Sequence, residues 1–168
     1  KPILIPCVQE DGAPYKVLFK NEDLRVDYII MKIIKLMDII LKKEQGLDLG
    51  ILTYNILPTS SQDGFIEIVP DSETIYHIKT KMGYSILNYI MDNNKNKTVE
   101  IIRNNFMKST AAYCVITYLL GIGDRHLDNI MINRNGLLFH IDFSFILGSD
   151  PKLINPIMRI TPDMVDAL

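Results

Sequence analysis

Cysteine is scarce in this chain of 168 residues, which contains only Cys7 and Cys114. The two residues stand far apart among apolar neighbours, without the short spacings that hold a zinc ion. They also cannot supply a disulfide framework. Neither kind of site is expected, and the composition is compatible with a reducing compartment.

An excess of charge is also missing, because 18 basic and 20 acidic residues leave a net charge of −2. A surface for nucleic acid would need a basic excess or stripe, so no nucleic-acid partner is expected. Long apolar runs are absent as well, since Lys32, Lys35 and Thr117 interrupt the longest ones. The sequence therefore predicts neither a transmembrane segment nor a signal peptide.

What remains is the composition of an ordinary globular protein, with 48% hydrophobic and 23% charged residues. A chain of this length suggests one domain that can bury roughly two-thirds of its unfolded surface. The chain begins at Lys1, without a methionine and inside a strand-like run, so we expect it to be a fragment.

The first 69 residues predict a small antiparallel β lobe with one helix. Residues 1–8 and 15–20 have the patterns of an edge strand and its antiparallel neighbour. Residues 23–43 have helical periodicity, with an aspartate at the N-cap and apolar residues around most of the circumference. That pattern predicts burial on more than one side. Further strands are expected at 51–57 and 65–69.

The remaining residues predict a mostly helical region. Helices are expected at 72–78 with Ser72 as the cap, at 84–91, at 99–120 and from 162 onward. The third of these helices has a possible break near residues 108–109. Gly121 is suited to end it, because a glycine readily adopts the left-handed conformation that follows a helix.

A hairpin lies between these helices, and the dipeptide Asn135-Gly136 predicts its turn. A type I′ turn needs φ > 0 at both central residues, which Asn-Gly favours. In that register Asn129 stands opposite Asp142, where directly opposed Cβ atoms are roughly 4.5–5.5 Å apart. An amide oxygen and a carboxylate at this distance could bind a hard cation.

Together these residues suggest phosphoryl transfer, which needs a cation for phosphates, oxygen ligands for Mg²⁺ and a group that orients the attacking hydroxyl. Lys20 could supply the first, Asn129 and Asp142 the second, and Asp124 or His126 the third. Each residue also has a plain alternative. Lys20 could be a solvated strand end, and the Asn129–Asp142 pair could merely cap the hairpin. Their occurrence in one chain favours the functional interpretation.

Three motifs resemble those of the phosphatidylinositol 3-kinase superfamily. They are Gly-Asp-Arg-His-Leu-Asp-Asn at 123–129, Phe-His-Ile-Asp-Phe at 139–143, and Val-Leu-Phe-Lys at 17–20 with Asp-Leu-Arg-x-Asp at 23–27. They occur in the superfamily's order, and the resemblance extends from about Tyr15 to the last residue. The stretches 113–118, 126–129 and 146–152 look most like class III, the branch specific for phosphatidylinositol.

The resemblance implies a bilobal, protein-kinase-like α+β fold. It places a partial N-lobe with the hinge strand at 1–69 and a C-lobe with the catalytic hairpin and activation loop at 70–168. It implies ATP and either Mg²⁺ or Mn²⁺ as cofactors. By position, the catalytic residues are His126, Asp124 and Lys20, and the metal ligands are Asn129 and Asp142. The nucleotide-binding residues are Lys20, Asp27, Tyr54, Glu67, Val69, Met131 and Ile141.

The loop after Asp142 is where the superfamily selects its lipid. Branches that accept phosphorylated inositides carry many cations there, because each phosphate adds roughly −1.5 to −2 charge. Here the basic residues within 145–161 are only Lys152 and Arg159. This shortage favours phosphatidylinositol itself in a membrane surface. The class III resemblance further implies regulatory protein subunits, peripheral location on endosomal or other internal membranes, and roles in membrane trafficking and autophagy.

Two positions depart from the superfamily's pattern. Ser144 replaces the glycine of Asp-Phe-Gly, which would cost roughly 1–2 kcal/mol if the backbone needed φ > 0 there. The Lys20–Asp23 link is one residue shorter than usual. Two other functions stay open, a serine/threonine kinase of the related branch and a homologue that binds only nucleotide or partners.

Overall fold

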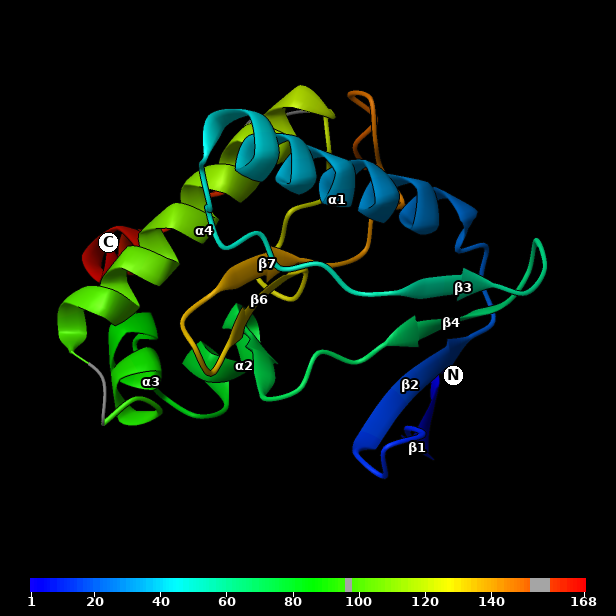
Figure 1. Cartoon of the computed structure of the whole chain (residues 1–168), viewed down its shortest axis with the longest axis horizontal. Helices are drawn as coiled ribbons and strands as arrows, with labels where there is room; N and C mark the ends of the chain where they lie inside the picture. The colour runs from blue at the N-terminus through cyan, green and yellow to red at the C-terminus, as the bar shows by residue number, and fades with distance from the viewer. Residues whose placement is uncertain (96–97, 152–157) are drawn as a thin grey trace.

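The structure is a computed structural model and describes residues 1–95, 98–151 and 158–168. Over these residues the chain is an α+β protein, as predicted (Figure 1). Its strands form a four-stranded sheet and a three-stranded sheet in which all pairs are antiparallel. Within the described ranges, no helix combines the length and apolar character needed to cross a bilayer.

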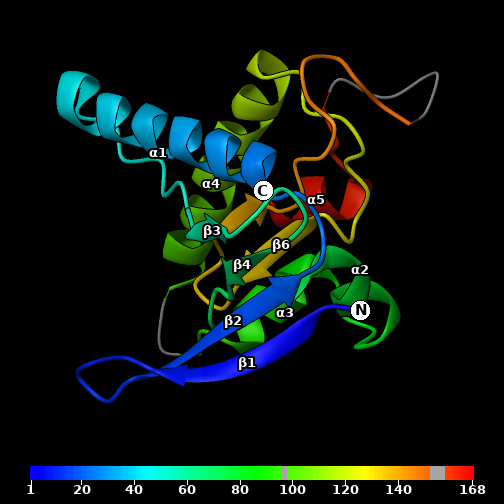
Figure 2. The same cartoon turned by 90° about the vertical axis from the view of Figure 1, so that its right-hand side faces the viewer.

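The four-stranded sheet has the order β1-β2-β4-β3. β1 lies at its edge and pairs antiparallel with β2, and both features were predicted (Figure 2). β2 also pairs with β4, which places Lys20 opposite Gly64. The strands are β1 (Ile3–Val8), β2 (Pro14–Lys20), β3 (Ile56–Pro58) and β4 (Gly64–Glu67).

The strand predicted at 51–57 is wrong over residues 51–55, because only Ile56–Pro58 pairs in the sheet. Ile51 and Tyr54 are buried in the core instead. The Tyr113 hydroxyl donates a hydrogen bond to the Leu52 carbonyl at 2.6 Å. A helix side chain therefore satisfies a backbone group that a neighbouring strand would otherwise bind.

Helix α1 (Arg25–Gln45) follows β2 and ends at Gly46, whose φ of 63° is left-handed. The predicted cap is one residue out of place, since Leu24 occupies the N-cap position and is fully buried. Asp23 accepts a hydrogen bond from the Arg25 N–H at 3.1 Å instead. The prediction of burial on several sides is also wrong. The helix lies along the outside of the molecule (Figure 1), with apolar side chains that stay exposed at Ile29, Leu36 and Ile40.

The three-stranded sheet contains β5 (Ser72–Thr74), β6 (Ile130–Asn133) and β7 (Leu138–His140) in that order. Ser72 does not cap a helix, because it pairs with Asn133 in the sheet. The cap of helix α2 (Ile75–Thr80) is Thr74, whose hydroxyl accepts a hydrogen bond from the His77 N–H at 3.1 Å.

The other helices are α3 (Ile86–Asp92), α4 (Val99–Leu119) and α5 (Pro162–Ala167). Helix α4 continues through the break expected near residue 108. The Ser109 hydroxyl donates to the Asn105 carbonyl at 2.7 Å and accepts from the Leu138 N–H at 2.9 Å. The serine therefore joins α4 to β7 without interrupting the helix, and Gly121, with a φ of 55°, follows the helix end.

The β6–β7 hairpin has a longer turn than predicted. The Asn133 N–H donates to the Leu137 carbonyl at 3.0 Å. Among the described residues of this turn, only Gly136 has a positive φ, of 80°. This is a three-residue loop ending in a left-handed glycine, not a two-residue type I′ turn. Asn133 favours the longer loop because its Oδ1 accepts the N–H groups of Asn135 and Leu137, both at 3.0 Å.

The longer loop moves the register by one residue. Met131 pairs with Phe139, and the Ile141 N–H donates to the Asn129 carbonyl at 3.1 Å. The predicted pairing of Asn129 with Asp142 is therefore wrong. In the observed register Asn129, Met131 and Ile141 share one face of the hairpin, since alternate residues of a strand point to the same side.

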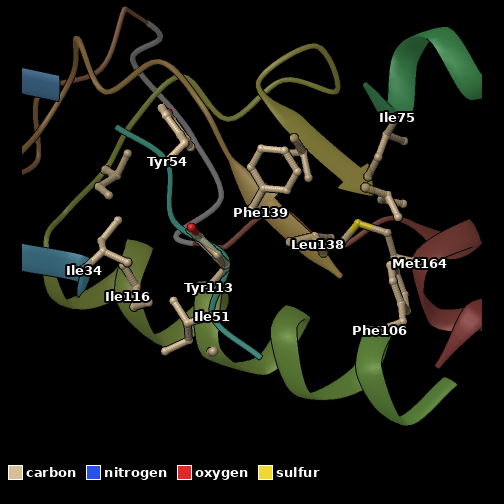
Figure 3. Packing of buried hydrophobic residues seen from close by; sticks show 14 of the residues in the cluster. Ile34, Ile51, Tyr54, Ile75, Phe106, Tyr113, Ile116, Leu138, Phe139 and Met164 are labelled. Carbon is tan, nitrogen blue, oxygen red and sulfur yellow. The ribbon is translucent and has the colours of Figure 1, made fainter. Parts of the chain in front are cut away.

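The core includes buried side chains from helices α1 to α5, from the hairpin and from segment 51–55. Phe139 lies between Tyr54 and Leu138, and Tyr113 extends from α4 toward segment 51–55 (Figure 3). His140 belongs to this core, since its ring stacks on Tyr113 with centroids 5.1 Å apart. Burial lowers the pKa of His140 to about 3, helped by the nearby Arg125 charge. His140 is therefore a buried core residue.

Candidate active site

A cavity of about 150 Å³ lies where β2, α1, β4 and the hairpin meet. Lys20 enters from the end of β2, Asp27 from the first turn of α1, and Asp142 from the residues after β7. Nine of the site residues expected from the sequence line this cavity: Lys20, Asp27, Tyr54, Glu67, Val69, Asn129, Met131, Ile141 and Asp142. The structure thus brings together residues more than a hundred positions apart.

Five further residues line the cavity and were not predicted from the sequence: Leu18, Ile66, Ile68, Ser72 and Phe139. Leu18 could have been found, because it is two residues before Lys20 on the same strand face. Phe139 would have followed from the correct hairpin register, which sets it opposite Met131. These side chains give the cavity apolar walls around its charged end.

Lys20 is held at the charged end by Glu22, whose Oε1 lies 2.6 Å from the lysine Nζ. No role was predicted for Glu22. The Lys20 charge also favours the ionised forms of Asp27 and Asp142. The short link between Lys20 and α1 therefore leaves all three side chains around one cavity.

Asp27 joins helix α1 to the segment after β7. Its Oδ1 accepts a hydrogen bond from the Phe143 N–H at 2.8 Å, and its side chain is buried. Burial raises the pKa of Asp27, an effect that this hydrogen bond and the Lys20 charge partly oppose.

Arg125 holds the same segment from the other side. Its guanidinium donates to the carbonyls of Gly123 and Ile141, both at 2.8 Å, and to the Asp142 carbonyl. It also lies over the Phe143 ring, 5.6 Å from the centroid. Arg125 therefore has a structural role, and its hydrogen-bond partners are backbone carbonyls.

Asn129 is buried and its amide nitrogen donates to the Asp124 carbonyl at 3.0 Å. This bond leaves the amide oxygen as the atom with which Asn129 could bind a cation. Asp142 has a φ of 60°, which turns its backbone out of the strand. The turn explains how both side chains line the cavity although the residues are not paired.

The Asp142 carboxylate accepts two hydrogen bonds from Ser144. The hydroxyl lies 2.7 Å and the backbone nitrogen 3.3 Å from Oδ1. Burial raises the pKa of Asp142, but the Ser144 hydrogen bonds and the charges of Lys20 and Arg125 oppose it, so the pKa is lowered overall. Ser144 is not among the described residues with positive φ, so replacing glycine there requires no backbone strain.

Among the described residues, no three His, Cys, Asp or Glu side chains cluster as a complete metal site. The donors present are the amide oxygen of Asn129 and the carboxylate of Asp142. Such a pair fits Mg²⁺, which is typically bound through one or two protein oxygens together with substrate phosphates.

Asp124 and His126 lie on the loop before β6 and are not among the residues that line the cavity. His126 Nε2 is 3.7 Å from Asp124 Oδ2, and the His126 side chain is 45% exposed. The loop is tied to the site because Asp124 accepts the Asn129 amide bond. Asp124 itself has a φ of 52°, and its N–H donates to the Asp150 carboxylate at 2.8 Å.

Of the two cations in the loop at residues 145–161, the structure describes Arg159. Arg159 is exposed and lies outside the lining of the cavity. Lys152 lies outside the described residues.

Comparison with known proteins identifies the family. The profile of the family described as phosphatidylinositol 3- and 4-kinase matches residues 14–168. The chain belongs to the phosphatidylinositol 3- and 4-kinase family. A chain of this family carries a kinase domain, and kinases use ATP together with a divalent cation.

Proteins similar to this chain are found in fungi and plants. This chain is 42% identical to the phosphatidylinositol 3-kinase pik3 of Schizosaccharomyces pombe over an alignment of 175 residues. The alignment covers 99% of this chain and 21% of that protein. The chain is 43% identical to the phosphatidylinositol 3-kinase VPS34 of Saccharomyces cerevisiae, over 99% of this chain and 19% of that protein. The VPS34 protein of Arabidopsis thaliana is 40% identical, over 95% of this chain and 20% of that protein. The chain thus spans about a fifth of the length of the curated relatives it matches.

Proposed function

We propose that this chain is the catalytic part of a lipid kinase that transfers the γ-phosphoryl group of ATP to the 3-hydroxyl of phosphatidylinositol. The observation that carries the proposal is the meeting of Lys20, Asn129 and Asp142 at one cavity in a member of the phosphatidylinositol 3- and 4-kinase family. The three residues come from separate segments and supply the cationic and oxygen groups that phosphoryl transfer needs.

The nucleotide would lie along the cavity with its phosphates at the charged end. Lys20 binds the phosphates, and Asp27 keeps the Phe143 backbone in position through their 2.8 Å hydrogen bond. Backbone groups of Glu67 and Val69 hydrogen-bond the adenine. The flat base packs between apolar side chains of the lining: Leu18, Tyr54, Ile66, Met131 and Ile141.

Asn129 and Asp142 would hold Mg²⁺ or Mn²⁺ through their side-chain oxygens. When bound, the cation neutralises charge on the phosphate oxygens. Lys20 acts in the same direction from the end of β2.

His126 accepts the proton of the inositol hydroxyl, and Asp124 orients its imidazole across the 3.7 Å separation. Exposure suits this role, because the acceptor arrives on a membrane surface rather than inside the protein. A histidine is the side chain whose ordinary pKa lies nearest to neutral pH, which makes it an effective general base.

The preference for phosphatidylinositol follows from the loop at residues 145–161, which carries only Lys152 and Arg159. Two cations suit an unphosphorylated headgroup. The named relatives are phosphatidylinositol 3-kinases and support the class III interpretation. That interpretation implies regulatory protein subunits and a peripheral place on endosomal or other internal membranes. Residues 1–69 form the N-lobe side of the cavity, and residues 70–168 form the C-lobe side.

The test is a phosphorylation assay on the full-length protein, with [γ-³²P]ATP and three acceptors: phosphatidylinositol vesicles, phosphatidylinositol 4,5-bisphosphate vesicles and a serine-containing peptide. We expect label in phosphatidylinositol, at least about tenfold faster than in the bisphosphate. Faster labelling of the peptide would instead favour a protein kinase. ATP binding without transfer to any acceptor would identify a non-catalytic homologue.

A further inference from the structure

Ser144 makes a contact that glycine could not make at this position. Its hydroxyl donates to Asp142 Oδ1 at 2.7 Å, and its N–H approaches the same oxygen at 3.3 Å. A glycine would offer only the longer N–H contact. The side chain of Ser144 therefore binds directly to a carboxylate that lines the cavity.

The backbone around Asp142 is already fixed by other residues. Asp27 binds the Phe143 N–H, and Arg125 binds the carbonyls of Ile141 and Asp142. These contacts leave the carboxylate itself free to rotate about its side-chain torsions. The Ser144 hydroxyl restrains that rotation because it binds one of the two carboxylate oxygens.

We propose that Ser144 is a positioning residue that binds Oδ1 of Asp142 and so presents Oδ2 to the divalent cation. The proposal rests on the proposed function, because that function assigns Asp142 to the cation. It gives the serine a definite role where the superfamily's motif has glycine.

A hydrogen bond from the neutral hydroxyl of an exposed serine to a carboxylate contributes a modest free energy. Its removal should weaken cation binding by about threefold to tenfold. The weaker cation binding should result from loss of the hydroxyl group and not from a more flexible backbone. Alanine and glycine at position 144 should therefore behave alike, whereas threonine should preserve binding.

The experiment measures free Mn²⁺ by electron paramagnetic resonance, with the full-length protein and a non-hydrolysable ATP analogue. The variants are S144A, S144G and S144T. S149A serves as the matched control, because Ser149 is an exposed serine of the following loop. We expect a higher Mn²⁺ dissociation constant for S144A and S144G, and wild-type values for S144T and S149A.

Two results would overturn the positioning role. The first is a wild-type dissociation constant for S144A, and the second is an equal loss in S144T and S144A. A wild-type protein that binds no Mn²⁺ with the nucleotide analogue would overturn the proposed function itself, and with it the role of Ser144. The Mn²⁺ measurement is independent of phosphate transfer, so the two failures can be told apart.

Discussion

At the scale of single residues, Asp27 combines a useful hydrogen bond with an unfavourable burial. Burial raises its pKa above the ordinary value, although the Phe143 N–H and Lys20 oppose the change. The folded chain therefore holds a proton on Asp27 more tightly than the unfolded chain does. The stability contributed by this residue falls as pH rises from about 4 through the raised folded-state pKa.

Asparagine at position 27 cannot ionise but keeps an oxygen that can accept the Phe143 N–H. We expect D27N to gain stability relative to the wild type as pH rises from about 4 to neutrality. Urea unfolding of both proteins across this interval measures the difference. A difference in the free energy of unfolding that does not change with pH would contradict the assignment.

The stability contributed by His140 depends on pH in the opposite direction. Burial depresses its pKa to about 3, well below the ordinary value of about 6.5. Acid therefore favours the unfolded chain, and stability is lost as pH falls below about 6.5. From pH 7 to pH 5 the expected loss is about 2 kcal/mol.

Phenylalanine at position 140 should remove much of this acid sensitivity, because it can stack on Tyr113 and cannot be protonated. The exchange gives up no hydrogen bond at Nδ1, which has no partner among the described residues. Urea unfolding at the two pH values checks the prediction. If H140F loses as much unfolding free energy between pH 7 and pH 5 as the wild type does, His140 is not the cause of the acid sensitivity.

At the scale of elements, the loop that carries Asp124 and His126 is bound by a contact from the loop that follows the hairpin. The Asp150 carboxylate accepts the N–H of Asp124, whose φ is positive. Gly123 permits this close approach, because a Cβ there would lie 2.7 Å from Asp150 Oδ2 and 2.3 Å from the Ser149 carbonyl. Asp150 therefore helps to position Asp124 and His126.

We expect D150A to lower kcat by about tenfold, because a small displacement of a catalytic group lowers the rate strongly. The KM for ATP should change little, since the cavity lining does not include Asp150. D150N keeps an acceptor oxygen, so its kcat should fall less than that of D150A. Steady-state kinetics on phosphatidylinositol vesicles measure both constants, and a larger effect on KM than on kcat would contradict the positioning role.

The elements also show how far the sequence alone can lead. Most strand and helix positions followed from periodicity, and the α+β class was correct. The hairpin register was wrong by one residue, because the side chain of Asn133 binds the turn and lengthens it. The strand at 51–55 failed for a related reason, since Tyr113 from a distant helix binds its backbone. Such tertiary contacts are not visible in a local pattern.

The candidate site was predicted better than the register that first suggested it. Asn129 and Asp142 do not pair, yet both line the cavity because the positive φ of Asp142 turns its backbone. The family motifs located these residues without any geometry. They could not reveal the contacts of Lys20 with Glu22 or of Arg125 with carbonyl groups, which depend on the folded arrangement.

At the scale of the whole molecule, two helices carry exposed apolar side chains that do not line the cavity. Ile29, Leu36 and Ile40 on α1 and Val115, Tyr118 and Leu119 on α4 are each more than 40% exposed. Large exposed apolar surface usually marks an interface. The chain corresponds to about a fifth of its relatives, so kinetic measurements belong on the full-length protein.

The central claim is that the cavity of Lys20, Asn129 and Asp142 is the site of phosphoryl transfer to phosphatidylinositol. Its most direct test compares the full-length wild type with D142N, by initial rates on phosphatidylinositol vesicles with Mg²⁺ or Mn²⁺ and by thermal unfolding. We expect D142N to lose at least about 99% of the rate, since the substitution removes a charged cation ligand. Its unfolding temperature should stay within about 3 °C of the wild type. Appreciable activity in a folded D142N protein would contradict the assignment of this cavity.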